Sequence, residues 1–419
     1  MLFNLVKNEL IKITRRSKTW IVFGLFALAM IGFVVIAKVS SNQMEHWQSP
    51  QGQIENIDNQ LSWMKDDMER QEKDIASNNY DKETVNNIKE NINYLKEDIK
   101  RLEGDRKLQE KRIETPENVD WRDEVKAEIA GYESNIKNAE TTGYDKESIK
   151  HFEQQIKDKQ YFLDNNIEPV EGWEFFPSNV AIQVMMILGM GILVAGIAVF
   201  MSDIVSGECT PATVKFLLVQ PVSRGKVLLS KFIAIVITVV GMIAGLEIAA
   251  FGIMGAFTGF DAAKMPVTLG QKYIINQEVL IKEGMKQLEL VPGSGYQSTV
   301  GDMVFRGFLI QILFIIACVA FIFMISSLFK SSMITMAVSV IIAVASTMLP
   351  MASEKIASYA HLNFLNYSSP INLLMGDMPF MYHNNISFTP QLGIGLMVGA
   401  IIVSYIISHF VFTRRDMLM

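Results

Sequence analysis

Cysteine and histidine are scarce in this chain of 419 residues, which contains two cysteines and five histidines. Both cysteines, Cys209 and Cys318, lie outside the charged segment 39–177, so that segment has no disulfide framework. The histidines are scattered, without the paired spacing of metal ligands. We therefore expect no metal site, and since no Ser-His-Asp constellation is evident we expect no catalytic residues.

A phosphate-binding loop is also missing. The pattern Gly-x-x-x-x-Gly-Lys-Ser/Thr does not occur in the sequence, and neither does a Ser-Gly-Gly-Gln signature. The chain is therefore expected to hold no cofactor and not to be an enzyme. Basic residues gather only beside hydrophobic segments, which argues against nucleic acid as a partner.

Apolar sequence, by contrast, is abundant: 50% of the residues are hydrophobic and the mean hydropathy is +0.23. A helix of about 20 apolar residues crosses the hydrocarbon core of a bilayer, and six such runs occur. The sequence predicts an all-α polytopic membrane protein with six transmembrane helices, at 19–38, 178–202, 232–258, 304–328, 332–352 and 391–413.

Lysine and arginine placement predicts the orientation of these spans. Basic residues precede the first span, flank the loop 203–231, occupy the short loop at Lys330, and follow the last span at Arg414 and Arg415. With six spans, all four segments fall on the same side, which the positive-inside rule assigns to the cytoplasm. Both termini are then cytoplasmic.

The first 18 residues have the pattern of an amphipathic helix. Apolar residues recur at helical spacing, and basic residues occupy the opposite face. We expect a helix lying in the membrane interface over 1–18, and the alternative is a simple extension of the first span. The first span itself is expected to stay attached, because Ala37-Lys38-Val39 offers no small-x-small cleavage site.

Segment 39–177 is of a different character. It carries 19 basic and 32 acidic residues, a net charge of −13 in a chain whose total is −6, and apolar residues follow heptad spacing. The sequence Tyr80-Asp81-Lys82-Glu83 returns 64 residues later as Tyr144-Asp145-Lys146-Glu147, with each Asp at an N-cap position. We predict two antiparallel helical hairpins forming an extracytoplasmic coiled-coil domain. Its acidity suits an extracytoplasmic protein or a cationic peptide, although solubility alone would also explain it.

Two further loops, 259–303 and 353–390, are expected on the exterior. The first combines a short amphipathic stretch with the turn Pro292-Gly293-Ser294-Gly295. The second is aromatic and apolar rather than charged, which favours short re-entrant helices at the outer interface.

The loop 203–231 carries the most specific motif. It contains Gly207-Glu208-Cys209-Thr210-Pro211-Ala212-Thr213, then a Leu-Leu pair and Pro221-Val222-Ser223-Arg224. Threonine can cap a short helix and proline suits its first turn, so the loop can present a rigid helix with charged ends. The alternative is an ordinary amphipathic loop that follows the positive-inside rule.

This segment resembles the first cytoplasmic loop of type-2 ABC exporter permeases, where an acidic residue precedes Gly-Thr, a Leu-Leu pair and Pro-x-Ser-Arg. Ala212 stands where that family usually has glycine. The ending Phe412-Thr413-Arg414-Arg415-Asp416 is similar to that of many such permeases. The resemblance implies that the ATPase is coupled through five residues: Glu208, Thr213, Pro221, Ser223 and Arg224.

The resemblance, which favours the sodium-efflux and antimicrobial-peptide export branch, also implies partners and a location. ATP would bind a separate cytoplasmic ATPase subunit, a second permease copy or a sister permease would complete the pore, and the complex would lie in the bilayer of the bacterial plasma membrane. The substrate class stays open among peptide, antibiotic, lipid-like compound and ion. The alternative is a membrane-anchored interaction or signalling protein that relays ATPase action to envelope partners without transport.

Polar and glycine residues inside the spans complete the list of candidates. Glu247 lies near the middle of 232–258, where a carboxyl group is costly. It is either a translocation-path residue or a packing residue, with Arg306 and Gln311 as candidate partners. Two Gly-x-x-x-Gly pairs, at 241/245 and 395/399, permit close helix approach, which we expect within the chain rather than between two copies.

Overall fold

The structure is a computed structural model that describes residues 2–77, 81–114, 120–142, 146–189, 191–202, 204, 206, 223–329 and 331–414. The chain divides into two compact units: unit 1 comprises residues 1–35 and 175–419, and unit 2 comprises residues 36–174. Helix α2 (Ser17–Gln48) contributes residues to both units.

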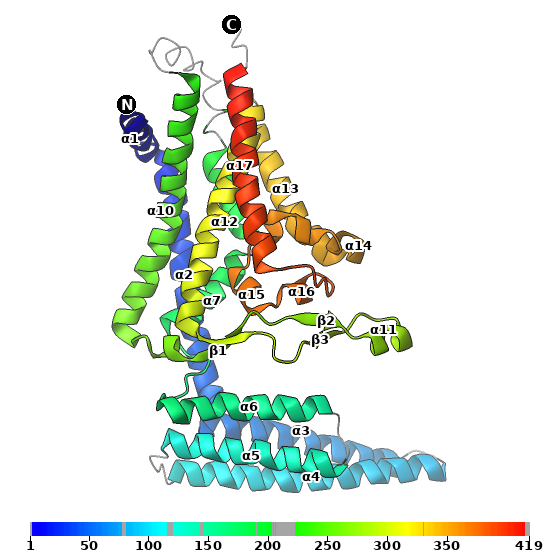
Figure 1. The fold of residues 1–419 in the computed structure, drawn as a ribbon. Coiled ribbons are helices and arrows are strands. Elements are labelled where there is room, and N and C mark those ends of the chain that lie inside the picture. The colour runs from blue at the N-terminus through cyan, green and yellow to red at the C-terminus, as the bar shows by residue number, and fades with distance from the viewer. Residues whose placement is uncertain are drawn as a thin grey trace. The chain divides into compact units, whose positions relative to one another are not determined.

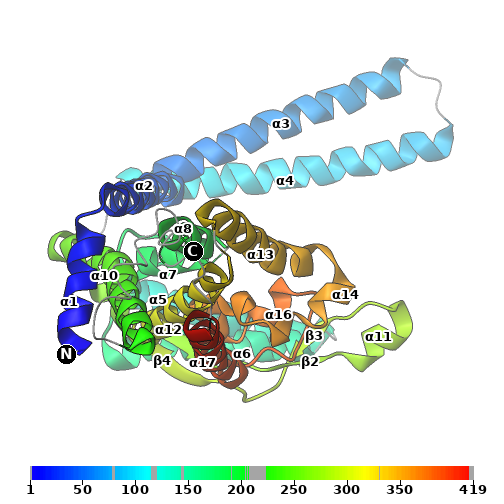
Figure 2. The ribbon, with the colours of Figure 1, turned by 90° about the horizontal axis from the view of Figure 1, so that it is seen from above.

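Unit 2 consists of helices that pair as antiparallel hairpins (Figure 2). Helix α3 (Pro50–Ser77) pairs with α4 (Lys82–Glu114), and α5 (Trp121–Thr142) pairs with α6 (Lys146–Asn165). Ion pairs join the partners, including Asp58–Arg106 at 2.6 Å and Lys65–Glu103 at 3.1 Å between α3 and α4. The apolar seam that the heptads predict is thus flanked by exposed charges, which explains why so charged a segment folds as helices.

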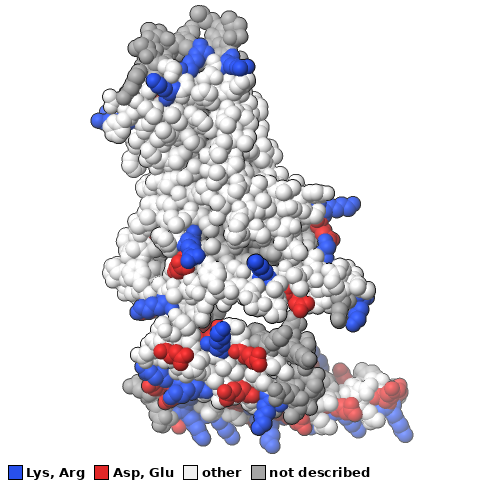
Figure 3. All heavy atoms as spheres, in the orientation of Figure 1, with Lys and Arg blue, Asp and Glu red and all other residues white. Residues whose placement is uncertain are grey.

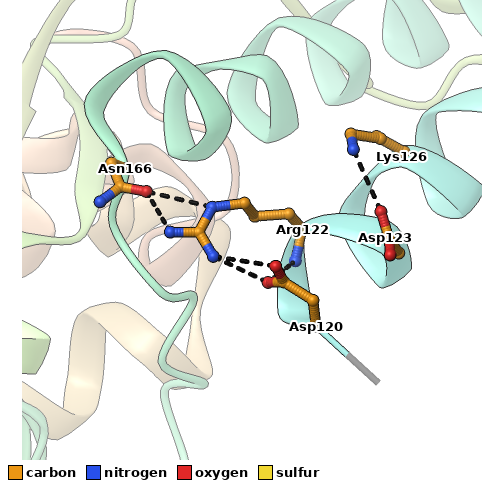
Figure 4. A network of polar contacts seen from close by, with 5 residues as sticks. All are labelled: Asp120, Arg122, Asp123, Lys126 and Asn166. Carbon is orange, nitrogen blue, oxygen red and sulfur yellow. Dashed lines mark hydrogen bonds and ion pairs between the residues drawn. The ribbon is translucent and has the colours of Figure 1, made fainter. Parts of the chain in front are cut away.

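Aspartate residues begin helices α4 and α5 of unit 2. The backbone N–H of Thr84 donates to Asp81 Oδ1 at 2.9 Å, as expected of an N-cap, whereas its predicted counterpart Asp145 lies outside the described residues. At the start of α5, the Arg122 guanidinium binds both Asp120 and the Oδ1 of Asn166, just beyond the end of α6 (Figure 4). This arginine therefore ties the two ends of the second hairpin together.

Acid should loosen this junction. The pKa of Asp120 lies below its usual value, mainly because the backbone N–H of Arg122 donates to the carboxylate, with the Arg122 side chain adding to the effect. Folding thus favours the ionised form, and its stabilisation is lost as the pH falls through the folded-state pKa, below about 4. The hydrogen-exchange protection factors of α5 and α6, which correct for the pH dependence of intrinsic exchange, should fall over that range in the wild type and depend less on pH in Asp120→Asn. Equal pH dependence in both proteins would contradict the assignment.

Unit 1 contains the membrane-spanning helices. Five described helices are long and apolar enough to cross a bilayer: α2, α10 (Arg224–Thr258), α12 (Val300–Leu328), α13 (Ser332–Ala352) and α17 (Pro390–Arg414). A sixth span exists if the bent pair α7 (Pro177–Leu188) and α8 (Ile192–Met201) is counted as one. Figure 3 shows a broad surface over these helices without charged side chains. The chain is thus a helical polytopic membrane protein.

The span predicted at 178–202 is bent, because α7 and α8 meet at an angle of 67°. Gly191 takes a φ of 91°, which a side chain would strain. Gly189 packs against the backbone of Ser368, whose hydroxyl donates a hydrogen bond to the Gly189 carbonyl. The side chain from a distant loop therefore satisfies a backbone group that the break leaves unpaired, as a membrane interior demands.

Helix α12 occupies the centre of unit 1. It packs against α7, α8, α10, α13 and α17 (Figure 1). Phe314, Cys318 and Phe323 on this helix are completely or almost completely buried. Phe323 also contacts Phe232 of α10, with ring centroids 5.5 Å apart.

Segment 259–303 forms small sheets, which the sequence analysis did not predict. After a short 3-10 helix, η2 (Asp261–Lys264), strand β1 (Pro266–Leu269) pairs antiparallel with β4 (Tyr296–Thr299), and β2 (Tyr273–Ile275) pairs with β3 (Leu288–Leu290). Helix α11 (Gln277–Glu283) connects β2 to β3. The expected turn is present, with Gly293 and Gly295 at positive φ.

Segment 353–390 is a chain of short helices packed on the spanning helices. They are α14 (Glu354–Ala357), η3 (Ala360–Leu362), η4 (Phe364–Tyr367), α15 (Pro370–Met375) and α16 (Met378–Met381). The Tyr367 hydroxyl donates to the His361 carbonyl at 2.8 Å, and Tyr382 stacks on Phe388 with centroids 4.7 Å apart. Burial raises the pKa of Tyr382 to about 12. These aromatic residues therefore form a packed layer rather than an exposed loop.

The glycine pairs of α10 and α17 do not mediate close packing against any described part of the chain. A methyl group added to Gly241, Gly245, Gly395 or Gly399 would meet no atom of the described structure within 4 Å. Among the described residues, the expected packing of these glycines within the chain is therefore not found, and a contact between two copies is the alternative that remains.

Gly189→Ala should destabilise unit 1, because its new Cβ would lie 2.6 Å from the Ser368 carbonyl oxygen. Such overpacking costs roughly 1–3 kcal/mol. The control is Gly241→Ala, whose added methyl meets open space. Thermal unfolding of both purified variants in detergent is the measurement, and equal midpoints for the two would refute this account of the break.

Candidate functional site

The predicted coupling loop is only partly described. Glu208, Thr213 and Pro221 lie outside the described residues, whereas Ser223 and Arg224 are within them. Ser223 is the N-cap residue of α10, and its carbonyl accepts the backbone N–H groups of Lys226 and Val227 at 3.0 and 3.2 Å. Arg224 Nη1 donates to the Thr413 carbonyl at 3.4 Å. The end of the loop is therefore joined to the last turn of α17.

A pocket of about 540 Å³ lies at this contact between α10 and α17. Lys226 and Ser223 line it from α10, and Tyr405 and His409 line it from α17. Gly225 allows the close approach, because a Cβ there would lie 2.7 Å from the His409 ring. The start of α10 therefore lies in close contact with the last turns of α17.

The N-terminal helix α1 (Leu2–Thr14) packs on α10 at the same end of unit 1 (Figure 1). The helix is interrupted between α1 and α2. At this point Thr19 Oγ1 donates to the Ile13 carbonyl at 2.6 Å, and Trp20 Nε1 donates to the Thr14 carbonyl at 2.8 Å. Helix α1 is therefore a separate element rather than an extension of the first span.

A buried ion pair fastens α1 to α10. Lys231 Nζ lies 3.1 Å from Glu9 Oε2, and the two side chains are only 2% and 16% exposed. Attraction between charges increases where water is excluded, but each charge alone would then be costly. The pair therefore fixes α1 to the last residue of the predicted loop 203–231, which lies about two turns into α10.

Serine hydroxyl groups connect the end of α8 to α12. The Ser206 backbone N–H donates to Ser326 Oγ at 3.2 Å, and Ser326 Oγ donates to the Ser202 carbonyl at 3.3 Å. These groups are buried. The start of the coupling loop is thereby joined to the central helix, just as its end is joined to α1 and α17.

Glu247 lies in the middle of α10 and is 1% exposed. Gln311 Nε2 of α12 donates to Glu247 Oε1 at 2.8 Å. Of the two candidate partners of Glu247, Gln311 is thus the one that forms a hydrogen bond with it. Arg306 instead binds Asp302 and the Tyr296 hydroxyl, each at 2.9 Å. Among the described residues, no three His, Cys, Asp or Glu side chains gather as a metal site would require.

Sequence reasoning missed the Lys231–Glu9 pair and the serine contacts. Residues 9 and 231 are separated by 222 positions, and residues 206 and 326 by 120. Two features of the sequence could have indicated the pair. Glu9 is the one acidic residue in the basic segment 2–14, and Lys231 directly precedes an apolar span.

These features define a polytopic membrane protein in which the loop before α10 is joined to the surrounding helices on both sides. The chain belongs to the ABC-2 family of transporter proteins, whose family model matches residues 3–417. It is therefore the permease type of subunit, the membrane component of an ABC transporter. Comparisons with curated proteins and with solved structures found no match.

Lys231→Met should destabilise unit 1 strongly, because it leaves the Glu9 carboxylate largely buried without its cation. Removing one partner of a buried pair costs about 3–5 kcal/mol. The double variant Lys231→Met with Glu9→Leu should recover much of this loss. The measurement is the unfolding free energy in mixed micelles.

The control for this prediction is Lys264→Ala, which removes an exposed pair with Asp261 whose side chains are 63% and 65% exposed. It should cost less than about 1 kcal/mol. A double variant as unstable as Lys231→Met would show that the pair itself is not responsible.

Proposed function

We propose that this ABC-2 permease is an exporter subunit that works with a separate ATPase subunit. The observation that carries the proposal is the family match over nearly the whole chain, together with the motif in 203–231. ATP would bind on the partner, since no phosphate loop occurs in this sequence. The export direction and the sodium-efflux and antimicrobial-peptide branch rest on the resemblance of that motif.

The loop 203–231 is proposed to receive the force of the ATPase. Glu208, Thr213 and Pro221 would form the docked helix, and Ser223 and Arg224 would transmit its movement into α10. Arg224 contacts the end of α17, and Lys231 contacts α1. A shift of the loop would therefore move three helices of unit 1 together, which supports a coupling role for the loop.

The remaining partners and the location are part of this proposal. A second permease copy or a sister permease would complete the pore in the bacterial plasma membrane, with both termini in the cytoplasm. The hairpins of residues 39–177 would then lie outside, where a protein or cationic peptide can meet them. The substrate is proposed to leave from the cytoplasm or the inner leaflet.

A second candidate function is favoured by the independence of unit 2, which forms a compact body of its own. In that case ATPase action would be relayed through the hairpins to envelope partners, without transport. Mass spectrometry of proteins that copurify from gently solubilised membranes separates the two. A near-stoichiometric ATPase without envelope enzymes supports export, whereas an ATPase together with envelope enzymes supports relay.

Arg224→Ala and Glu208→Ala should leave membrane insertion intact but reduce stimulation of the partner ATPase several-fold. Glu208→Ala removes a charge from the proposed docking surface, and Arg224→Ala removes the contact with the end of α17. The matched control is Lys264→Ala, in an exposed ion pair at the opposite end of α10. ATPase activity of the reconstituted complex is the measurement. Wild-type stimulation by both loop variants would remove the coupling assignment.

A further inference from the structure

An apolar groove separates α2 from α10 in unit 1. Its volume is about 450 Å³, and its lining includes Met30 and Val34 of α2 and Leu246, Ala250 and Phe257 of α10. The lining is almost entirely hydrocarbon and aromatic. Phe257 is 87% exposed, so the groove opens to the side of the helix bundle.

A smaller cavity, of about 20 Å³, adjoins this groove between α2, α7 and α10. Its lining includes Phe26, Phe33 and Leu188, and it shares Met30 and Leu246 with the groove. Glu247 also lines it. Within the two linings, which consist of described residues, Glu247 is the one ionisable side chain.

The carboxyl group of Glu247 is only half satisfied. Oε1 accepts from Gln311, whereas Oε2 is buried and has no hydrogen-bond partner among the described residues. A buried polar atom without a partner is costly, and more so in a membrane interior. The cavity offers room for one group of the size of a water molecule. An ammonium group is of that size, donates hydrogen bonds and supplies the opposite charge.

We propose that the groove and cavity together bind a single-chain amphiphile with a primary amine. The alkyl chain lies in the groove between α2 and α10, and the ammonium group donates to Glu247 Oε2. Phospholipid headgroups are too large for the cavity, and a fatty acid would bring a like charge. This site rests on the proposed function, since it names the substrate class of the exporter.

The site can be tested on the full-length protein in detergent, without ATP or an ATPase. The probe is dodecylamine with a photoreactive diazirine in its chain, and labelled peptides are located by mass spectrometry. We expect labels on α2 and α10 around Met30 and Ala250. Unlabelled dodecylamine should compete at least ten-fold better than dodecanol or dodecanoic acid.

Three variants sharpen the test. Glu247→Gln keeps the shape of the side chain and should abolish the preference for amine over alcohol. Ala250→Phe fills the groove and should remove labelling by the amine probe. Ile248→Phe is the matched control, because Ile248 is 61% exposed and does not line the groove. Gel filtration of each variant establishes that it is folded.

Equal competition by amine and alcohol in the wild type would overturn the proposal and leave water or bulk lipid as the occupant. Unchanged amine labelling in a folded Glu247→Gln variant would also overturn it. The proposed function is tested separately, by ATPase coupling of the loop variants. Amine binding without ATPase coupling would retain the binding site and remove the coupling assignment. ATPase coupling without amine binding would retain the coupling assignment and overturn the binding site.

Discussion

The burial of α12 is the constraint on which the rest of unit 1 depends. In a membrane, helices gain little from hiding apolar surface, so close packing and satisfied polar groups hold them together. Helix α12 contributes to both, since Phe314 and Phe323 pack in the centre, Gln311 Nε2 donates to Glu247, and Ser326 bonds to the end of α8. The bent pair α7–α8 and helix α15 pack on it, and Phe364 of η4 contacts Phe314.

Polar contacts in unit 1 are concentrated where elements have to be held in register. One group joins the two sides of the coupling loop to α1, α12 and α17, and another fixes the break between α7 and α8. Other buried polar atoms of unit 1 also lack a hydrogen-bond partner, among them Gln311 Oε1 and Ser339 Oγ. Among these described atoms, Glu247 Oε2 is the one that belongs to an ionisable side chain lining a cavity, which is why the groove beside it matters.

The sequence predicted what depends on local pattern. Apolar runs located the spanning helices, and heptads and Asp81 located helices of unit 2. Contacts between distant residues escaped prediction: the break at Gly189 depends on Ser368, and β1 finds its partner about 30 positions away. Gln311 was foreseen as a partner of Glu247 because few polar residues occur within the spans. Of the five coupling residues, only Ser223 and Arg224 fall within the described part.

The Lys231–Glu9 pair has an evolutionary consequence. Either substitution alone leaves a charge in a place with little access to water, so a lineage can lose the pair only through a poorly folding intermediate. Exchange of the two charges, or their joint replacement by apolar residues, avoids that outcome. Positions 9 and 231 should therefore vary together among relatives, which links the extreme N-terminus to the coupling segment in the history of the family as well as in space.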